Sequence, residues 1–392
     1  MWIETLRLKD FRNYDELMIH PSSEINILFG QNGSGKTNII EAIHYCALGK
    51  SHRTSQDKEV VRKDQPGAAC GIIVIKNHLK DDIAVKLTPS EARKKTVYIG
   101  HKKADRISAL MGHLQCVIFS PEDLMMIKEG PSIRRKYIDM MISQVNPLYF
   151  VELQKYQKNL DQRNAVIREG KKAGSVSHDL LESFDIQLAK SAEIIIPLRT
   201  SMIDKANQIA GETYKEISGR ENEAFHLSYS CCLKDTDNIE QQFLVHLRKN
   251  RDDDVFRGTT SFGIHREDIL TLLNGKEMKL FASQGQIRTA ALSMKLAQID
   301  LFHDLTGEDP VLLLDDVMSE LDMGRRKRLV SKISQVQTFI TCTDESDLQL
   351  SEQPRSYCVR LNHENMGTVE ESYRGVSNKS AENVEILDPD FD

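Results

Sequence analysis

The sequence has no apolar run long enough to cross a membrane, and its longest aliphatic stretches are short pieces such as residues 311–314. Residues 1–7 contain no apolar core of the kind found in signal peptides. The seven cysteines are scattered, odd in number and without a C-x-x-C pair, which favours reduced thiols over a disulfide framework or a zinc site. We therefore expect a cytoplasmic protein with no membrane contact.

The bulk composition is that of an ordinary globular protein. The 392 residues suffice for two or three domains, and 40% hydrophobic with 28% charged residues allow a substantial core. The net charge of -6 argues against a protein that coats nucleic acid over its whole surface. It leaves local basic patches open.

A glycine-rich turn follows an apolar stretch at residues 25–29 and matches the pattern G-x-x-x-x-G-K-[ST]. Glycines let successive backbone N–H groups face an anion, and the following helix directs its positive end to the same place. The lysine supplies a charge for the β- and γ-phosphates, and the threonine hydroxyl a ligand for Mg²⁺. The pattern predicts a nucleoside triphosphate site made of Gly30, Gln31, Asn32, Gly33, Ser34, Gly35, Lys36 and Thr37.

A second motif is the aliphatic run at 311–314, which ends in Asp315 and Asp316. The first carboxylate is placed to orient Mg²⁺, as a Walker B aspartate does. The second is placed to polarise an attacking water. Two acids after a strand are often only a solvated turn, but the P-loop in the same chain favours the catalytic interpretation.

A third motif precedes a helix expected at about 286–305. The small-residue turn Ser283, Gln284, Gly285 and Gln286 offers a hydroxyl and an N–H at a helix N-terminus, which is a second anion site. Alone it is also a good helix-capping sequence. Its order between the P-loop and the twin aspartates supports the functional interpretation, as does the stretch that follows them, Ser319, Glu320, Leu321 and Asp322.

The periodicity of the chain divides it into segments. Strand patterns dominate to residue 119, helical spacing dominates 131–219 with Pro197 expected to kink or interrupt a long helix, and a strand-like stretch returns at 225–230. A two-residue turn is predicted at Asn274-Gly275. We predict an ATPase lobe split between 1–125 and 255–375, a helical lobe at 126–254 and a disordered tail at 376–392.

Taken together, the motifs resemble the ABC-type ATPase head in its SMC-like DNA-repair branch, and within that branch the RecF family over nearly the whole chain. The stretches that carry the resemblance are 6–14, 30–37, 50–54, 119–124, 131–135, 263–268, 282–286 and 314–322. The resemblance implies an α/β fold, with a mixed sheet and flanking helices. It also implies a smaller all-helical lobe, inserted between the Walker A motif (the P-loop at 30–37) and the signature motif at 283–286.

The resemblance also implies how ATP and Mg²⁺ are used. Two heads would close around two ATP molecules as an ATP-dependent homodimer, with Ser283 to Gln286 of each head completing the P-loop of the other and 319–322 serving as D-loop. Thr37 and Asp315 would hold Mg²⁺, and Asp316 would position water in a weak, DNA-stimulated ATPase. Arg12 and Asn13 lie where the family contacts nucleotide, and 341–344 would form the switch loop.

The partner implied by the resemblance is single-stranded or gapped DNA, in recombinational repair, replication restart and the SOS response. RecR and RecO-type mediators and RecA would act with the protein. Basic side chains able to contact phosphates, or to form only a solvated face, are Lys50, Arg53, Arg93, Lys94, Lys95, Lys102 and Lys103. No helix-turn-helix or zinc-finger pattern occurs, so backbone contacts are expected.

Two other classes of protein share part of this pattern. A transporter ATPase subunit also pairs a P-loop with a signature turn, but usually in a compact domain, whereas Lys36 and Asp315 here lie 279 positions apart (315 − 36). A GTPase would carry the guanine-reading tetrapeptide N-K-x-D, which is absent. Both are disfavoured.

Overall fold

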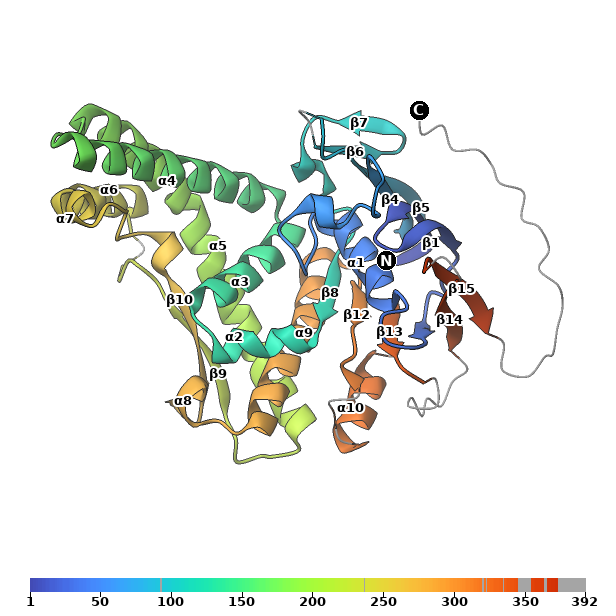
Figure 1. Cartoon of the computed structure of the whole chain (residues 1–392). Helices are drawn as coiled ribbons and strands as arrows, with labels where there is room; N and C mark the ends of the chain where they lie inside the picture. Colours follow the sequence, from blue (N-terminus) through green and yellow to red (C-terminus); the bar gives the residue numbers. More distant parts are fainter. Residues whose placement is uncertain are drawn as a thin grey trace.

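The structure is a computed structural model that describes residues 1–91, 94–235, 237–318, 321, 323–333, 335–344, 354–362 and 365–372. Two sheets and a central helix form one lobe, and long helices with a small sheet form the other (Figure 1). None of the described helices is long and apolar enough to cross a membrane.

The first sheet of the two-sheet lobe is antiparallel throughout. Its alternating buried and exposed residues turn one face to the core, as a half-buried sheet requires. In spatial order its strands are β2 (Tyr14–Ile19), β1 (Trp2–Phe11), β4 (Ala68–Lys76), β5 (Leu79–Leu87), β6 (Lys95–Ile99) and β7 (Lys102–Ala104).

The second sheet is parallel except for one edge strand. Its inner strands β12 and β13 are buried along their whole length because both faces of the sheet are covered. The spatial order is β15 (Gly367–Ser372), β14 (Arg355–Leu361), β3 (Ile25–Phe29), β13 (Thr338–Cys342), β12 (Val311–Leu314) and β8 (Cys116–Phe119). The carboxyl ends of the parallel strands therefore meet at one edge, where ligands bind in open α/β sheets.

Helix α1 (Lys36–Leu48) lies between the two sheets and is buried along most of its length. Its aliphatic side chains share one core with β1 and β4 on one side and with β12 and β13 on the other. This burial fixes the start of the helix, and thus Lys36, against the end of β3.

The second lobe is mainly helical. Its helices are α2 (Met125–Lys128), α3 (Pro131–Val145), α4 (Pro147–Ala173), α5 (His178–Ser218), α6 (Ile239–Lys249) and α7 (Arg251–Arg257). At its core Arg163 donates to Asp185 at 2.6 Å and to Asp254 at 2.7 Å, all three side chains being fully buried. This ion cluster ties α4, α5 and α7 together.

The second lobe was predicted to be all-helical, but it also contains a three-stranded sheet. This sheet joins the two halves of the chain. It consists of β9 (Phe225–Ser230), β10 (Asp268–Leu273) and β11 (Lys276–Glu277). Strand β9 pairs with a strand much further along the chain, with Ser230 opposite Asp268, so the sheet is a tertiary contact that helical periodicity does not reveal. The predicted turn at Asn274-Gly275 is confirmed between β10 and β11.

Helices α8 (Met278–Phe281) and α9 (Gln284–Thr306) lead from this sheet to β12, and α10 (Met323–Ile333) joins β12 to β13. Short 3₁₀ turns occur elsewhere in the chain, at Asp57–Glu59, Ile107–Leu110, Pro121–Leu124 and Ile264–Arg266. The interruption predicted at Pro197 is wrong, because α5 continues through it for 41 residues. The predicted tail, 376–392, lies outside the described residues.

Candidate functional site

The P-loop connects β3 to α1 and requires glycine at two positions. Gly30 has φ +149°, and a Cβ there would lie 2.1 Å from the Val359 carbonyl oxygen. Gly35 has φ +116°, and a Cβ would lie 2.7 Å from the Asn13 amide nitrogen. Both the backbone angle and the close approach exclude a larger residue. The loop is thus pressed against its neighbours at both ends, while Gln31, Asn32 and Gly33 face solvent.

Lys36 and Ser34 bring an ammonium group and a hydroxyl group to this loop. The Lys36 ammonium donates to the carbonyl oxygens of Gly30 at 2.8 Å and Gln31 at 3.0 Å. The Ser34 hydroxyl is buried and has no hydrogen-bond partner among the described residues. A buried hydroxyl is costly when unpaired, and a phosphate oxygen would satisfy it. The loop therefore fits a triphosphate.

Asn13, in the turn between β1 and β2, and Tyr14, the first residue of β2, support the loop. The Asn13 amide donates to the Ser34 carbonyl at 3.0 Å and accepts from the Asn38 amide at 2.8 Å, and the Tyr14 hydroxyl donates to the Gly35 carbonyl at 3.2 Å. The structure thus places Asn13 at the P-loop as a support for its backbone, and the predicted contact with nucleotide stays a prediction.

Asp315 lies beside Thr37, although the two are 278 positions apart in the chain. The Thr37 hydroxyl donates to the Asp315 carboxylate at 2.9 Å, and Thr341 at the end of β13 donates to the same oxygen at 2.8 Å. Burial raises the pKa of Asp315 above its usual value, against the lowering effect of the two hydroxyls. A buried carboxylate flanked by a hydroxyl is the ligand set that Mg²⁺ accepts.

Asp316 follows in the left-handed region, with φ +53°. Its N–H donates to the Thr341 hydroxyl at 2.8 Å, so Thr341 contacts both aspartates. The family resemblance placed 341–344 at the switch loop but did not reveal the role of Thr341. The signal was a hydroxyl at the carboxyl end of a strand next to the Walker B strand.

Arg12 lies in the predicted turn but is engaged by Glu41 of α1. Its guanidinium donates to both carboxylate oxygens, at 2.8 and 2.6 Å, and to the Glu59 carbonyl at 2.6 Å. Burial alone would raise the pKa of Glu41, but hydrogen bonds from Arg12 and Ser51 lower it. Arg53 reaches the same carboxylate at 3.4 Å and donates to the Asn38 side chain at 3.0 Å. The sequence motifs did not point to Glu41, which organises these basic groups around the start of α1.

The signature turn caps α9 and contacts the helical lobe, whereas the predicted division of the chain counted 283–286 with the ATPase lobe. Ser283 and Gln286 form a reciprocal capping box, with the Gln286 side chain also donating to Glu223 at 2.9 Å. Lys128 donates to the Gln284 side chain at 3.1 Å. All of these contacts stay within the turn's own lobe, so the turn is not held against the P-loop of its own chain by them.

Several predicted residues stand apart from this arrangement. Ser319, Glu320, Asp322 and Arg93 lie outside the described residues, whereas Leu321 is buried. Lys95, which was predicted for the DNA surface, makes its contacts within the protein. Its ammonium donates to the Gly49 carbonyl at 2.8 Å and pairs with Asp57 at 2.8 Å, so it stabilises the end of α1 and is mostly buried. Exposed basic side chains remain at Lys50, Lys94, Lys102 and Lys103.

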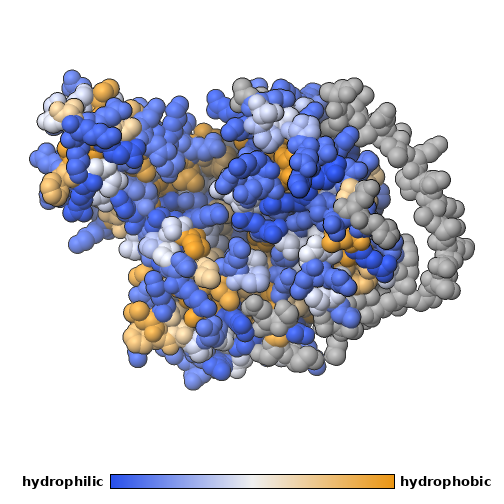
Figure 2. Space-filling model, viewed as in Figure 1, coloured by the Kyte–Doolittle hydropathy of each residue, from blue (hydrophilic) through white to orange (hydrophobic). Residues whose placement is uncertain are grey.

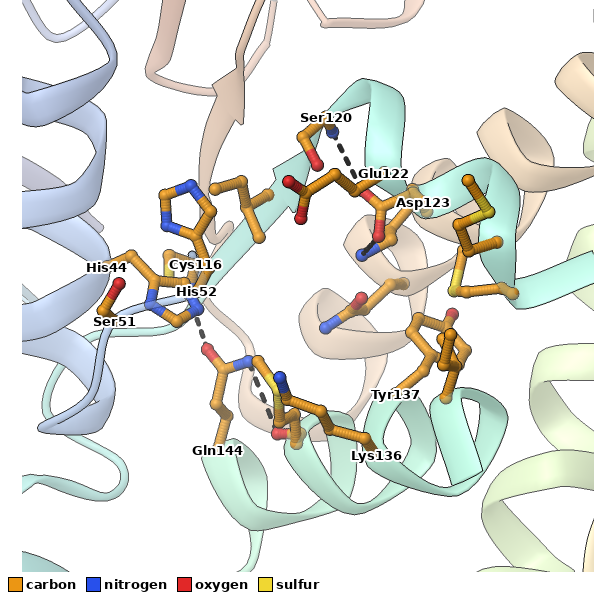
Figure 3. A pocket seen from close by; sticks show the side chains of 17 residues that line it. His44, Ser51, His52, Cys116, Ser120, Glu122, Asp123, Lys136, Tyr137 and Gln144 are labelled. Atoms are coloured by element: carbon orange, nitrogen blue, oxygen red, sulfur yellow. Dashed lines mark hydrogen bonds and ion pairs between the residues drawn. The ribbon is translucent and has the colours of Figure 1, made fainter. Parts of the chain in front are cut away.

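A cavity of about 430 Å³ is lined by residues of α1, β8, α3 and α9 and of the loops beside them (Figure 3). His44 and His52 enter it from one side, Glu122 and Asp123 from another, and Tyr137 from α3. Burial lowers the pKa of His52 to about 4. Neither Lys36 nor Asp315 lines it, so it is not the triphosphate site.

Comparison with known proteins gives a consistent answer. The sequence model of the RecF/RecN/SMC N terminal domain family matches residues 2–367. The DNA replication and repair protein RecF of Clostridium kluyveri is 41% identical over 352 residues, covering 90% of this chain and 95% of that protein. RecF of Clostridium perfringens (strain SM101 / Type A) is 41% identical over 349 residues, covering 89% and 94%.

Solved structures agree with this result. The recombination mediator protein RecF in the RecFOR pathway, with ATP, superposes with a TM-score of 0.84 at 33% identity, covering 95% of this chain and 99% of that one. An SMC head bound to the C-winged helix domain of ScpA has a TM-score of 0.55 at 16% identity, covering 96% and 98%, and shares the fold.

The fold and the site define an ABC-type ATPase head of the SMC-like class. Within that class the chain belongs to the RecF family of DNA replication and repair proteins. The comparisons give no support to a transporter subunit.

Proposed function

We propose that this protein is an ATP-dependent DNA-binding protein of recombinational repair and replication restart. Two copies pair head to head around two ATP molecules on single-stranded or gapped DNA, and slow hydrolysis releases them. The observation that carries the proposal is the hydrogen bond from Thr37 to Asp315, which joins the P-loop to the Walker B strand at one sheet edge.

The chain supplies the groups for ATP hydrolysis at this edge. Lys36, the backbone N–H groups of the loop and Ser34 bind and orient the phosphates. Thr37 and Asp315 would hold Mg²⁺, which neutralises charge on the β- and γ-phosphates when it is bound. Asp316, half-buried and fixed through its N–H by Thr341, positions the attacking water.

The second half of the site comes from the partner copy. The signature turn offers its helix N-terminus on the other lobe, so one chain holds two anion-binding turns that serve one site only in a dimer. Leu280 and Phe281, just before the turn, are 68% and 70% exposed. Figure 2 shows an apolar patch at the lower left, where α8 lies in Figure 1. Such a patch favours contact with another protein surface.

DNA is the partner that the basic residues and the family support. Lys94, Lys102 and Lys103 are exposed along the β6–β7 hairpin, and such side chains make the phosphate contacts that dominate non-specific affinity. RecR and RecO-type mediators and loading of RecA belong to the same proposal, because the related solved structures are of a mediator in the RecFOR pathway.

The decisive experiment removes the charge in the P-loop. Lys36→Ala should abolish ATP binding and ATP-driven dimerisation, because the loop then lacks its point charge for the β- and γ-phosphates. ATP affinity is measured by titration calorimetry and dimerisation by sedimentation. Lys158→Ala, at an exposed lysine on α4, is the matched control. An unchanged ATP affinity in Lys36→Ala would refute the assignment of the site.

A further inference from the structure

Two adjacent cysteines and a glutamate converge at the base of the small sheet in the second lobe. Cys231 and Cys232 follow the last residue of β9, and Glu267 precedes the first residue of β10. The two sulfurs and a carboxylate oxygen all lie within 4.8 Å of one another. Local sequence does not predict this group, because the cysteines are adjacent, without the C-x-x-C spacing, and Glu267 lies 35 positions further along.

The surroundings of Glu267 leave one of its oxygens directed at the cysteines. Arg199 donates to Oε2 at 2.7 Å, and the Tyr229 hydroxyl donates to the same atom. Oε1 accepts from the Cys232 N–H at 3.1 Å and from the Cys231 thiol at 3.5 Å. Arg199 therefore partly neutralises the carboxylate charge at Oε2, while Oε1 faces the two cysteines.

We propose that Cys231, Cys232 and Glu267 bind one zinc ion. Two thiolates and one carboxylate form a donor set that suits Zn²⁺, since soft sulfur ligands favour it over Mg²⁺ or Ca²⁺. Both thiols lose their protons to solvent as two Zn–S bonds form, and Oε1 becomes the third ligand. Both cysteines are only half-buried, so water can occupy the fourth position.

The ion would close the open end of the β9–β10 ladder. Ser230 and Asp268 are the last paired residues of these strands, and the ligands stand just beyond them on each side. The chain continues from β10 through β11 and α8 to the Ser283 turn. Zinc would thus stiffen the base of the hairpin that leads to the signature turn.

The test uses the full chain, stripped of metal and kept reduced with a phosphine. We expect one Zn²⁺ per chain in a chelator competition, and Co²⁺ substitution giving thiolate charge-transfer absorption. Cys231→Ser and Cys232→Ser should each weaken Zn²⁺ binding by at least about tenfold. Cys358→Ser, at a half-buried cysteine of β14 in the other lobe, should leave the affinity unchanged.

A second measurement needs no substitution. Zn²⁺ should protect Cys231 and Cys232 of the natural chain from alkylation while Cys358 reacts at its usual rate, as read by mass spectrometry. Absence of stoichiometric binding, a Co²⁺ spectrum without thiolate bands, or alkylation of Cys231 and Cys232 that zinc does not slow would overturn the proposal. A double Cys231→Ser/Cys232→Ser variant that binds Zn²⁺ as tightly as the natural chain would also overturn it.

Discussion

At the scale of single residues, Thr341 links the two aspartates of the candidate site. Its hydroxyl donates to the Asp315 carboxylate and accepts from the Asp316 N–H, and it is fully buried at the end of β13. Because one oxygen fixes both groups, the direction of the Asp315 carboxylate and the turn at Asp316 depend on each other. Thr341 is a positioning residue, and it acts through these two neighbours.

We expect Thr341→Val to lower ATP hydrolysis by about tenfold or more, as loss of supporting hydrogen bonds does at metal sites. ATP binding without Mg²⁺ should change little. The free energy of unfolding should fall by about 1–3 kcal/mol, because the partly buried Asp316 N–H and the buried Asp315 carboxylate each lose a partner. Steady-state hydrolysis and urea denaturation measure the two effects.

Thr338→Val is the matched control on the same strand. The Thr338 hydroxyl is also buried, but it donates to the Val336 carbonyl at 3.1 Å, away from the aspartates. It should destabilise the fold without altering hydrolysis. Equal hydrolysis by both variants would contradict the positioning role of Thr341.

At the scale of elements, α5 is a single helix of 41 residues that passes through Pro197. Proline in a helix interior removes one hydrogen bond and crowds the preceding turn. The side chain of Pro197 is exposed, whereas Ile195, Ile196 and Arg199 around it are buried. Tertiary packing of these neighbours therefore holds the helix together where local preference opposes it.

Pro197→Ala should raise the free energy of unfolding by up to about 3 kcal/mol, which is the difference in helix propensity between proline and alanine. Thermal and urea denaturation are the measurements. Glu193→Ala, one turn earlier at an exposed position, should change stability by no more than about 0.5 kcal/mol. A loss of stability in Pro197→Ala would show that the surrounding lobe depends on the proline geometry.

At the scale of the whole molecule, the P-loop and the signature turn belong to different lobes. Ser283→Arg should leave ATP binding by the single head intact and block ATP-driven pairing, because a large side chain then fills the surface that meets the partner's phosphates. Loss of the helix cap should cost about 1 kcal/mol. Sedimentation with and without ATP measures the pairing.

The control for Ser283→Arg is Ser177→Arg, which removes the N-cap of α5 at a distance from the signature turn. Its destabilisation should be similar and its ATP-dependent dimers normal. Normal dimers in Ser283→Arg as well would refute a site completed by the partner copy.

The DNA surface is also a property of the whole molecule. Exchange of Lys102 and Lys103 for glutamate should weaken DNA binding and flatten its salt dependence, by roughly 0.7 in log–log slope for each single-strand phosphate that is no longer neutralised. Fluorescence anisotropy at several salt concentrations measures both. The charge-matched double exchange Lys158→Glu/Lys190→Glu, at exposed helical-lobe positions, should bind DNA normally. Equal salt slopes for the two variants would show that Lys102 and Lys103 do not contact DNA phosphates.

Local sequence could predict the motifs, because each one is a contiguous pattern with its own physical logic. The P-loop at 30–37, the aliphatic strand before Asp315 and the Asn274-Gly275 turn all lie where the residue pattern predicted them. The division of the chain into 1–125, 126–254, 255–375 and 376–392 stays a prediction.

Contacts between distant segments could not be predicted in the same way. Glu41 gathers Arg12 and Arg53, Thr341 joins Asp315 to Asp316, and β9 pairs with β10, each across a chain separation that local pattern does not encode. The sequence by itself was enough to predict a triphosphate site, since glycines, lysine and threonine at fixed spacing supply the groups that bind phosphates and Mg²⁺. Only the tertiary structure decided which buried groups hold it in place, because those partners are selected by the packing of parallel strands and of lobes.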